Sequence, residues 1–417
     1  MPGQGSRVLW ANLLRLDMSD IHRIADPLRS AKTTPTLAPV VPLLFIGALS
    51  SGVVIWVALT SGLYSDFVLW YESGRALREG RDLYFSPVSR PGFRNMSPPQ
   101  QVVLMAPLAW LSIRDALIAW WLISAAAMAG CVMLWRRVLP QGWPLALFAL
   151  LFASPAGYHN VRYANQSWVI AWAVTWAWVA WRQQQFRRAA FILGAAASIK
   201  LFLLAILPYL CWRRRWTAVG WYLAGVVTTV SLGLAVCGPE AFRSWYMALK
   251  ELTWQGQGLS MAVLGALTRA LAPRFSNLEP LIVMPGLIVP LWLAVSALLA
   301  GAVWWSLRRS HSSDIDLAAV LLCMLLVTPS GWVYYLPLAA GPIASVAAIG
   351  PRSWWWAVGS VALLFPYPLL GMGQPSAWAT MTIASSYFWG GAVLLMAVLR
   401  TAGWHTMLVR GRSQAHG

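Results

Sequence analysis

Residues 40–63 read VVPLLFIGALSSGVVIWVALTSGL, a run of 24 residues without a charged side chain. About 20 apolar residues in a helix span the hydrocarbon core of a bilayer, so this run is long enough to cross it. Similar runs recur along a chain of 417 residues that is 59% hydrophobic and 11% charged, with 28 tryptophans. A soluble domain of this length would carry far more charge. We therefore predict an all-α fold, a polytopic transmembrane helical bundle.

The charged residues are unbalanced and clustered. The chain has 31 Lys and Arg against 13 Asp and Glu, a formal net charge of +18, but no basic helix or RNA-binding pattern that would indicate a nucleic-acid partner. The arginines stand between apolar runs instead, as is typical of cytoplasmic loops under the positive-inside rule. The clusters are Arg136-Arg137, Arg187-Arg188, Arg213-Arg214-Arg215, Arg308-Arg309, Arg352 and Arg400.

Placing these clusters in the cytoplasm predicts about twelve spans, in a multi-pass protein of the cell (inner or plasma) membrane. Residues 1–39 form a cytoplasmic N-terminal tail, 40–400 a single transmembrane domain and 401–417 a basic cytoplasmic C-terminal tail. Residues 98–113 are apolar, but prolines open and interrupt them, which favours a re-entrant or interfacial segment. The expected spans cover about 40–63, 115–135, 143–156, 166–182, 187–199, 201–212, 217–237, 283–307, 315–328, 332–349, 354–370 and 386–400.

Residues 189–211 allow two interpretations. They are long enough for one span, but arginine clusters flank both ends and Lys200 lies at the centre. A lone ammonium at mid-bilayer costs roughly 3 kcal/mol on insertion scales. We therefore favour a hairpin of two short helices that places Lys200 near the outer surface. One span with Lys200 paired in a cavity is the alternative.

The cysteines indicate neither a metal site nor a disulfide framework. All four lie within or at the ends of apolar runs, and none belongs to a Cys-x-x-Cys pair, so we expect small buried hydrophobic residues. The sequence also shows no clustered set of His, Asp and Glu that would hold a divalent ion against a nucleotide diphosphate. We expect no metal and no cofactor. The cysteines are Cys131, Cys211, Cys237 and Cys323.

Asp66 is the first carboxylate after the apolar run that ends at residue 63. A carboxylate at a membrane surface is a candidate general base. Apolar and aromatic residues from 67 to 77 recur at helical spacing, which predicts an amphipathic helix lying on the membrane in the first outer loop, with Gly80 as its C-cap. Asp66 occupies the N-cap position of that helix, so a capping role is the alternative.

Several short motifs follow one another between about residues 60 and 340. The aspartate and the aromatic-rich helix, which ends Gly80-Arg81-Asp82-Leu83-Tyr84, precede a Pro98-Pro99 pair that opens an apolar helix. Further motifs are Asn165-Gln166, similar to part of a Gly-Gln-x-Asn stretch; Ala197-Ser198-Ile199-Lys200, similar to a Lys-Pro motif with Leu201 in place of the proline; Gly238-Pro239-Glu240 followed by Trp245; and Thr328-Pro329-Ser330-Gly331-Trp332. In this order they resemble glycosyltransferase family 87.

The resemblance implies a GT-C-type enzyme that moves a hexose, typically mannose, from a polyprenyl-phosphate donor to a lipid or glycan acceptor outside the cytoplasmic membrane. The phosphate leaving group needs positive charge, for which Lys200, Arg162 and Arg94 are the candidates at the outer face. Asp66 would accept the proton of the acceptor hydroxyl, with Glu72 and Asp82 as weaker candidates. A single base without a covalent nucleophile implies direct displacement with inversion.

Sugar or acceptor contacts are expected from Tyr84, Asn165 and Gln166. Family members often carry a histidine after the Ser-x-x-Trp stretch, whereas tyrosines follow Trp332 here, so Tyr334 or Tyr335 would replace it. Each candidate also has a structural interpretation. The two amides could join helices, and the basic side chains could extend to lipid headgroups. His159 could be a proton shuttle, but a lone interfacial histidine is more often structural.

A transporter or flippase of a lipid-linked saccharide is the alternative function. Such a protein should carry ionisable residues deep within several spans, whereas Lys200 is the one clear charge within an apolar run here. A glycan polymerase or ligase with a polyprenyl-diphosphate donor would have a large outer loop late in the chain, and this sequence has its largest loop first. The pattern therefore favours an enzyme with its site at one membrane surface.

Overall fold

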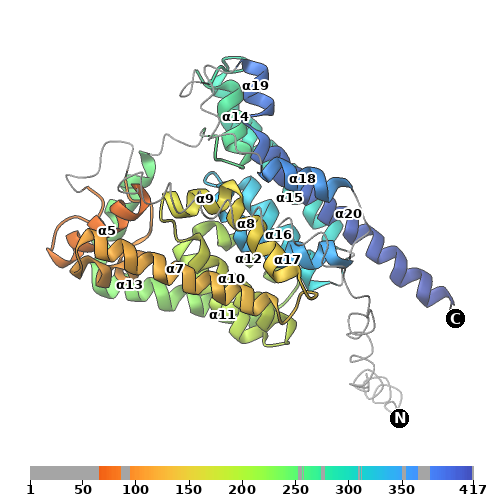
Figure 1. Cartoon of the computed structure of the whole chain (residues 1–417), viewed down its shortest axis with the longest axis horizontal. Helices are drawn as coiled ribbons and strands as arrows, with labels where there is room; N and C mark the ends of the chain where they lie inside the picture. Colours follow the sequence, from red (N-terminus) through yellow and green to blue (C-terminus); the bar gives the residue numbers. More distant parts are fainter. Residues whose placement is uncertain are drawn as a thin grey trace, which may run out of the picture. The chain divides into compact units, whose positions relative to one another are not determined.

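The described part of the computed structural model begins at Ser65. Residues 1–64, and with them the predicted N-terminal tail and the first span, lie outside the described residues. Every regular element of the described part is a helix, apart from an isolated bridge between Ser260 and Trp332, so the all-α prediction is confirmed (Figure 1). The described residues are 65–85, 94–251, 256, 258–273, 278–308, 310, 312–349, 354–364 and 376–415.

Most helices lie close to the expected apolar runs. The α-helices are α5 (Ser65–Arg78), α6 (Pro99–Met105), α7 (Ile113–Trp135), α8 (Trp143–Ala153), α9 (Pro155–Arg162), α10 (Ser167–Arg182), α11 (Phe186–Ile199), α12 (Ile206–Trp212), α13 (Trp216–Lys250), α14 (Val263–Leu271), α15 (Ile288–Leu307), α16 (Ser313–Val327), α17 (Pro337–Ile349), α18 (Trp354–Leu364), α19 (Ala377–Thr382) and α20 (Ser386–Ala415). Four 3₁₀ helices connect them: η1 (Ala106–Trp110), η2 (Leu201–Ala205), η3 (Pro285–Leu287) and η4 (Val333–Tyr335).

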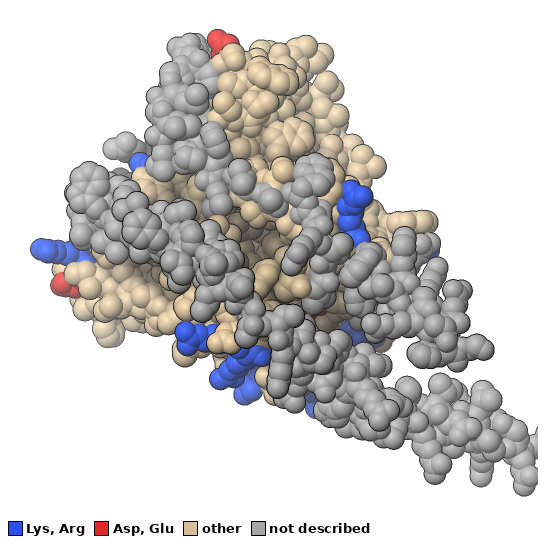
Figure 2. All heavy atoms as spheres, turned by 45° about the vertical axis from the view of Figure 1, so that its right-hand side comes forward, with Lys and Arg blue, Asp and Glu red and all other residues tan. Residues whose placement is uncertain are grey.

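Three helices of the described part are long and apolar enough to cross a membrane. They are α7, α13 and the continuous helix of η3 and α15. Shorter apolar helices occur at Trp143–Phe152, Leu201–Trp212 and Pro337–Ala348. Large uncharged areas of the surface fit contact with lipid, and charged side chains are few among the described residues that Figure 2 shows in colour. The apolar helices support a membrane protein, while the number of about twelve spans stays a prediction.

The chain reverses at Lys200, as the hairpin interpretation predicts. Lys200 is not helical, with φ −121° and ψ 93°, and separates α11 from η2 and α12. α13 then runs beside α11 in the same direction. Near their starts, Arg215 Cζ lies 5.3 Å from the ring centroid of Phe186, and farther along, Thr229 Oγ1 donates to Ser198 Oγ at 2.6 Å. The two flanking arginine clusters therefore share one end of the bundle and Lys200 lies at the other.

Buried ion pairs tie helices together at the end of the bundle away from the hairpin turn. Arg182 Nη1 at the end of α10 lies 3.3 Å from Asp314 Oδ2, and Arg213 Nη2 after α12 lies 2.5 Å from Asp316 Oδ2. Both carboxylates belong to the first turn of α16, where they also favour the helix dipole. The basic clusters around positions 182 and 213 thus lie at the same end.

α5 ends as the sequence predicts. The Arg81 N–H donates to the Ala76 carbonyl at 2.8 Å and Gly80 has φ +67°, which is the Schellman arrangement that favours glycine. The aromatic face of α5, with Phe67 and Trp70, is buried against η1 and α7. Protein rather than lipid therefore covers the face that the sequence assigned to the membrane surface.

The structure differs from the expected loops and tails in three places. The expected loop at 157–165 largely forms α9, which starts at Pro155, a residue whose fixed φ suits the first helical position. After the expected span at 217–237, the chain breaks at Gly238 (φ 72°, ψ 169°) and is then helical again to Lys250, where no span was expected. α20 continues to Ala415 because no proline interrupts it, so it includes most of the expected C-terminal tail.

Glycines allow α11 and α13 to pack closely. A Cβ atom added at Gly225 of α13 would lie 2.2 Å from the Phe191 carbonyl oxygen, and one at Gly194 of α11 would lie 1.9 Å from the Tyr222 carbonyl oxygen. Small residues at such contacts are usual between membrane helices, because van der Waals packing rather than the hydrophobic effect holds them together in lipid.

We expect Gly225→Ala to lower the free energy of unfolding by about 1–3 kcal/mol, because the new methyl group overlaps backbone atoms of α11 that cannot move away. Gly220→Ala in the same helix is the matched control, since a Cβ there meets nothing within 4 Å. Thermal unfolding of both variants in detergent measures the difference. Equal melting temperatures would contradict the close packing of the two helices.

Candidate active site

A cavity of about 450 Å³ opens at the end of the bundle where the chain reverses. Its walls come from segments far apart in the sequence, namely the first turn of α5, the residues before α6, the start of α10, the hairpin turn, the end of α13 and the segment from 328 to 335. Aromatic and aliphatic side chains form most of its lining. Among the described residues that line it, Asp66 is the one carboxylate, and Lys200 and Arg94 are the cations.

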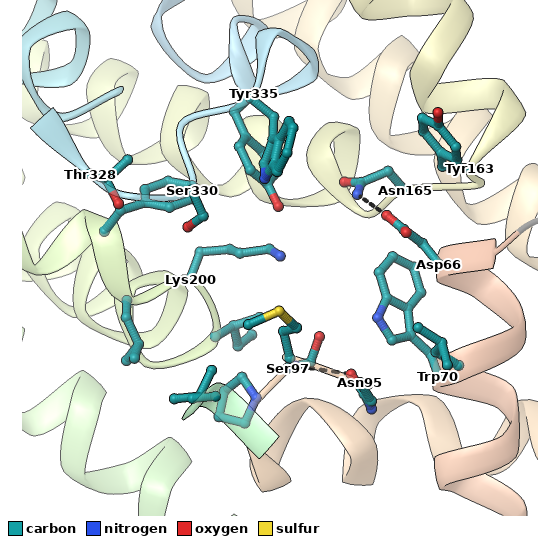
Figure 3. Close-up of a pocket in the computed structure, with 18 of the residues that line it drawn as sticks. Asp66, Trp70, Asn95, Ser97, Tyr163, Asn165, Lys200, Thr328, Ser330 and Tyr335 are labelled. Carbon is teal, nitrogen blue, oxygen red and sulfur yellow. Dashed lines mark hydrogen bonds between the residues drawn. The ribbon is translucent and has the colours of Figure 1, made fainter. Parts of the chain in front are cut away.

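Asp66 is held in the cavity by contacts of its own helix with the segment before α10. The Phe67 N–H in the first turn of α5 donates to the Tyr163 carbonyl at 3.3 Å. Asn165 Nδ2 donates to Asp66 Oδ2 at 2.8 Å (Figure 3). The other end of the Asn165 amide is fixed as well, because its Oδ1 accepts from the Ser167 N–H at 3.0 Å and from Ser167 Oγ at 2.6 Å.

Two roles were expected for Asp66, a general base and a helix cap. α5 begins at Ser65, so Asp66 lies in its first turn, and its carboxylate accepts a hydrogen bond from Asn165. Burial raises the pKa of the Asp66 carboxyl above its usual value, while the hydrogen bond from Asn165 and the charge of Lys200 act against that rise. A carboxylate with a raised pKa is a stronger base.

Lys200 enters the cavity from the hairpin turn. Its side chain extends toward the middle of the cavity, facing the side that holds Asp66 and Asn165 (Figure 3). The Nζ atom lies 5.1 Å from the ring centroid of Tyr335, and no described residue forms an ion pair or hydrogen bond with it. Burial lowers the pKa of the Lys200 ammonium to about 8, although the negative charge of Asp66 acts to raise it. A cation without an anionic partner in a cavity is suited to receive an anionic group.

Arg94, the second cation of the lining, is engaged in an ion pair. Its Nε lies 3.0 Å from Glu251 Oε2, and its guanidinium lies over the ring of Phe85 at 4.6 Å from the ring centroid. The pair ties the segment before α6 to the end of α13. Arg94 therefore adds positive potential to the cavity while Glu251 holds its position.

Tyr334 and Tyr335 also line the cavity, as expected of residues in contact with substrate. Tyr334 stacks on Trp332 with 6.0 Å between ring centroids, and Tyr335 packs against Phe202 at 4.9 Å. These rings form one aromatic wall. Aromatic faces of this kind suit the apolar faces of sugar rings.

Three predicted site residues are not brought to the cavity. Arg162 is exposed and its guanidinium lies over the rings of Tyr158 and Tyr163. Tyr84 is buried in a separate cluster, where its hydroxyl donates to the Ser97 carbonyl at 2.9 Å. Gln166 is buried, and its Nε2 donates to Gln101 Oε1 at 3.0 Å. Arg162 was assigned from its position near a span end, and Tyr84 and Gln166 from their motifs. Neither signal fixes the direction of a side chain, and a one-residue change along a helix is enough to turn it away.

Other titratable candidates also have structural partners. Glu72 pairs with Arg75 at 3.2 Å, and Asp82 accepts from two backbone N–H groups and from Ser244 Oγ. Burial lowers the pKa of His159 to about 3, so its imidazole is neutral at physiological pH, and it does not line the cavity. Asp66 is thereby the one candidate base among them that faces the cavity.

A group of three or more metal-binding side chains does not occur in the described part of the chain. The sequence has one Asp-x-Asp pair, Asp314 and Asp316, a spacing that can hold a divalent ion. It lies at the opposite end of the bundle, paired with arginines, where Trp178 and Tyr209 also donate to it. This pair is therefore part of the buried ion pairs and not of the cavity.

Several lining residues were not expected from the sequence. Trp70, Asn95 and Ser97 line the cavity near Asp66 and before α6. The signal for them was weak, because an aromatic residue in an amphipathic helix and polar residues before a Pro-Pro pair are common. The order of the motifs along the chain indicated the site, whereas no single motif identified these three lining residues.

The family assignment follows from comparison with known proteins. The model of glycosyltransferase family 87 matches residues 96–330, more than half of the chain and most of the segments that build the cavity. The chain belongs to glycosyltransferase family 87. This confirms the resemblance derived from the motifs, and the protein is a membrane glycosyltransferase.

Two family relatives carry a more specific name. The polyprenol-phosphate-mannose-dependent alpha-(1-2)-phosphatidylinositol pentamannoside mannosyltransferase of Mycolicibacterium smegmatis is 24% identical over 329 residues, which cover 74% of this chain and 75% of the relative. The protein of the same name from Mycobacterium tuberculosis is 26% identical over 326 residues, which cover 74% of this chain and 72% of the relative. No solved structure is significantly similar to this fold.

In this family 87 protein, Asn165 should control the acidity of Asp66. We expect Asn165→Ala to raise the pKa of the Asp66 carboxyl further, because the variant lacks the N–H donor that stabilises the carboxylate. The pKa is measured by infrared difference spectra of the carboxyl band against the matching Asp66→Asn protein. Asn160→Ala, which removes a buried amide bonded to the Tyr334 carbonyl, is the control and should not change it. Identical titrations in wild type and Asn165→Ala would refute this role.

Proposed function

We propose that this protein is an inverting mannosyltransferase that moves mannose from a polyprenyl-phosphate donor to a hydroxyl group of a lipid-linked or other glycan acceptor. The observation that carries the proposal is the pair formed by Asp66 and Lys200. One carboxylate with a raised pKa and one cation that has no ion-pair partner among the described residues face the same cavity. That combination fits a reaction in which a hydroxyl loses a proton and a phosphate leaves.

The proposed step is a single displacement. The acceptor oxygen attacks the anomeric carbon of mannose, and the bond from that carbon to the phosphate oxygen breaks. The electron pair of the broken bond stays on the phosphate, and the hydroxyl proton passes to Asp66. Because the described lining holds no second carboxylate that could act as a nucleophile, one inversion follows, and a β-linked donor gives an α-linked product.

Lys200 is the proposed contact of the leaving phosphate. The phosphate gains negative charge as the bond breaks, so an ammonium beside it stabilises the transition state more than the ground state. Phosphate is a good leaving group once its charge is compensated, and the reaction then needs no acid. Arg94 supports the same side of the cavity with a second positive charge.

The names of the two relatives support mannose as the sugar and a polyprenyl phosphate as its carrier. Both relatives use polyprenol-phosphate mannose and act on a phosphatidylinositol mannoside, according to their names. The cavity fits such an acceptor, because Trp70, Tyr163 and Trp332 provide aromatic faces for sugar rings around Asp66.

The distribution of charge supports an active site on the extracytoplasmic face. Arg182 and the arginine cluster at 213–215 lie at the end of the bundle opposite the cavity, and positive loops are retained in the cytoplasm. We propose a GT-C-type bundle of about twelve spans in the cell membrane, with cytoplasmic segments 1–39 and 401–417. The cavity then opens where lipid-linked sugars are presented on the outer side.

A transporter without catalytic activity is not favoured by any feature of the described part. A saccharide path would need ionisable residues along the spans. Most buried charges of the described helices gather at two ends instead, as Asp66 with Lys200 at one and the arginine–aspartate pairs at the other. Arg269 of α14 is also buried, and it donates to Ser385 Oγ and to the Ser260 carbonyl. This distribution fits an enzyme with one site.

We expect Asp66→Asn to lower kcat for mannose transfer by about 10²- to 10⁴-fold with little change in KM, because the variant keeps the shape of the side chain but cannot accept the proton. The measurement is transfer in proteoliposomes that contain purified protein, polyprenyl-phosphate mannose and a membrane glycolipid extract.

Glu72→Gln is the matched control for this experiment. It removes a carboxylate from the same helix, outside the cavity, and should retain nearly full activity. Equal rates for wild type and a folded Asp66→Asn would eliminate Asp66 as the base. Absence of transfer by the wild type with any polyprenyl-phosphate sugar would overturn the proposed reaction.

The pH dependence of transfer should identify Lys200. Its pKa of about 8 means that the ammonium loses its charge as the pH rises through 8, so kcat/KM for the donor should fall about tenfold per pH unit above that value. Arginine stays charged at every accessible pH, so Lys200→Arg should move this alkaline limb to higher pH.

Lys200→Met completes the series. It should lower kcat/KM by about 100-fold or more at pH 7, since a buried charge–phosphate contact is lost, and should show no alkaline limb. An alkaline limb that is the same in all three proteins would assign the titration to another group and remove Lys200 from donor binding.

A further inference from the structure

We infer that Gln100 and Gln101, at the start of α6, are positioning residues that hold the two halves of the active site at a fixed separation. This inference rests on the proposed function only in naming Asp66 and Lys200 as those two halves. The two glutamines, called here the glutamine bridge, touch neither residue. They act through the backbone and side chains next to them.

Gln101 reaches the half of the site that holds the base. Its Oε1 accepts a hydrogen bond from Gln166 Nε2 at 3.0 Å. Gln166 directly follows Asn165, the residue whose amide donates to Asp66. A buried hydrogen bond between two amides thus fixes the chain at the point from which the base is oriented.

Gln100 reaches the half of the site that holds the cation. Its Nε2 donates to the Ser198 carbonyl at 2.5 Å. Ser198 lies two residues before Lys200, in the last turn of α11, and its hydroxyl accepts from Thr229 of α13. The same short helix, α6, therefore contacts both sides of the cavity through adjacent side chains.

The bridge is buried, and one atom of each amide, Gln100 Oε1 and Gln101 Nε2, has no hydrogen-bond partner among the described residues. Gln100 and Gln101 are 3% and 2% exposed, so their amides are shielded from water that would compete for these hydrogen bonds. α6 also packs on α13, where a Cβ atom added at Gly233 would lie 2.8 Å from the Gln100 backbone nitrogen. A glutamine pair in an apolar bundle is costly to desolvate, and each makes one hydrogen bond that joins separate segments.

The chemistry gives such a bridge a purpose. The base must reach the acceptor hydroxyl while the cation reaches the phosphate on the other side of the same sugar. A displacement of about 1 Å is enough to lower the rate about 10²-fold, because the attacking and leaving oxygens must stay in line. A rigid link between the two halves would preserve this alignment.

The hydrogen-bond directions give the two positions opposite requirements. Position 101 must accept, so Gln101→Glu should retain activity, whereas the isosteric Gln101→Met should lower kcat about 10- to 100-fold with KM for donor and acceptor nearly unchanged. Position 100 must donate, so Gln100→Met and Gln100→Glu should both lower kcat.

Ser345→Ala is the control for both positions. It removes a buried hydrogen bond to Asp314 at the other end of the bundle, and it should lower the melting temperature without lowering kcat.

A distance measurement tests the bridge without activity. Spin labels at Arg162→Cys and Leu204→Cys, on exposed positions of the two halves, are placed in full-length protein with its four cysteines changed to alanine. We expect a narrow distance distribution that broadens or shifts with Gln100→Met or Gln101→Met and not with Ser345→Ala. Unchanged distributions, or Gln101→Met with wild-type kcat, would overturn the bridge. Inactive wild-type protein with the expected distance changes would refute the mannosyltransferase proposal and leave the bridge standing.

Discussion

The cost of removing charge from water governs the structure of this protein. An apolar helical bundle tolerates a charged side chain where hydrogen bonds, an opposite charge or an opening to water compensates the loss of solvation. Asp66 meets this condition with the amide of Asn165 and with its place at a cavity wall. Asn165 is in turn fixed by Ser167 at the start of α10. The position of one carboxylate therefore depends on the fold of segments almost a hundred residues apart.

The same constraint produces two different ends of the bundle. At one end, arginines are neutralised by aspartates, as in Arg182 with Asp314 and Arg213 with Asp316, and buried pairs of this kind satisfy each other. At the other end, Asp66 and Lys200 face one cavity, and these two described residues form no ion pair with each other. At the first end, these two pairs hold helices together. The other keeps charges available for a substrate.

Sequence reasoning located the elements better than the orientation of side chains. The arginine clusters around Lys200 predicted the chain reversal because a charge at mid-bilayer is costly, and Gly80 predicted the end of α5 because a left-handed residue favours glycine. Asp66, Asn165 and Lys200 were identified as site residues and line one cavity. Arg162 and Tyr84 do not, since neither hydropathy nor motif order fixes the direction of a side chain. Gln100 and Gln101 were beyond prediction, because their partners depend on tertiary packing.

The separation between Asp66 and Lys200 has a chemical consequence. If the two formed a direct ion pair, each would neutralise the other, and the donor phosphate would have to break that pair in order to bind. Without such a pair, the proposed donor phosphate would supply an anion for Lys200, which has no ion-pair partner among the described residues, and Asp66 would stay free to accept a proton. Burial acts in opposite directions on the two groups: it raises the pKa of Asp66 and lowers that of Lys200 to about 8. The charged form of Lys200 would therefore be stabilised by the donor phosphate, and Asp66 is suited to take the proton of the acceptor hydroxyl. The spacing of the two side chains would then align acceptor and donor.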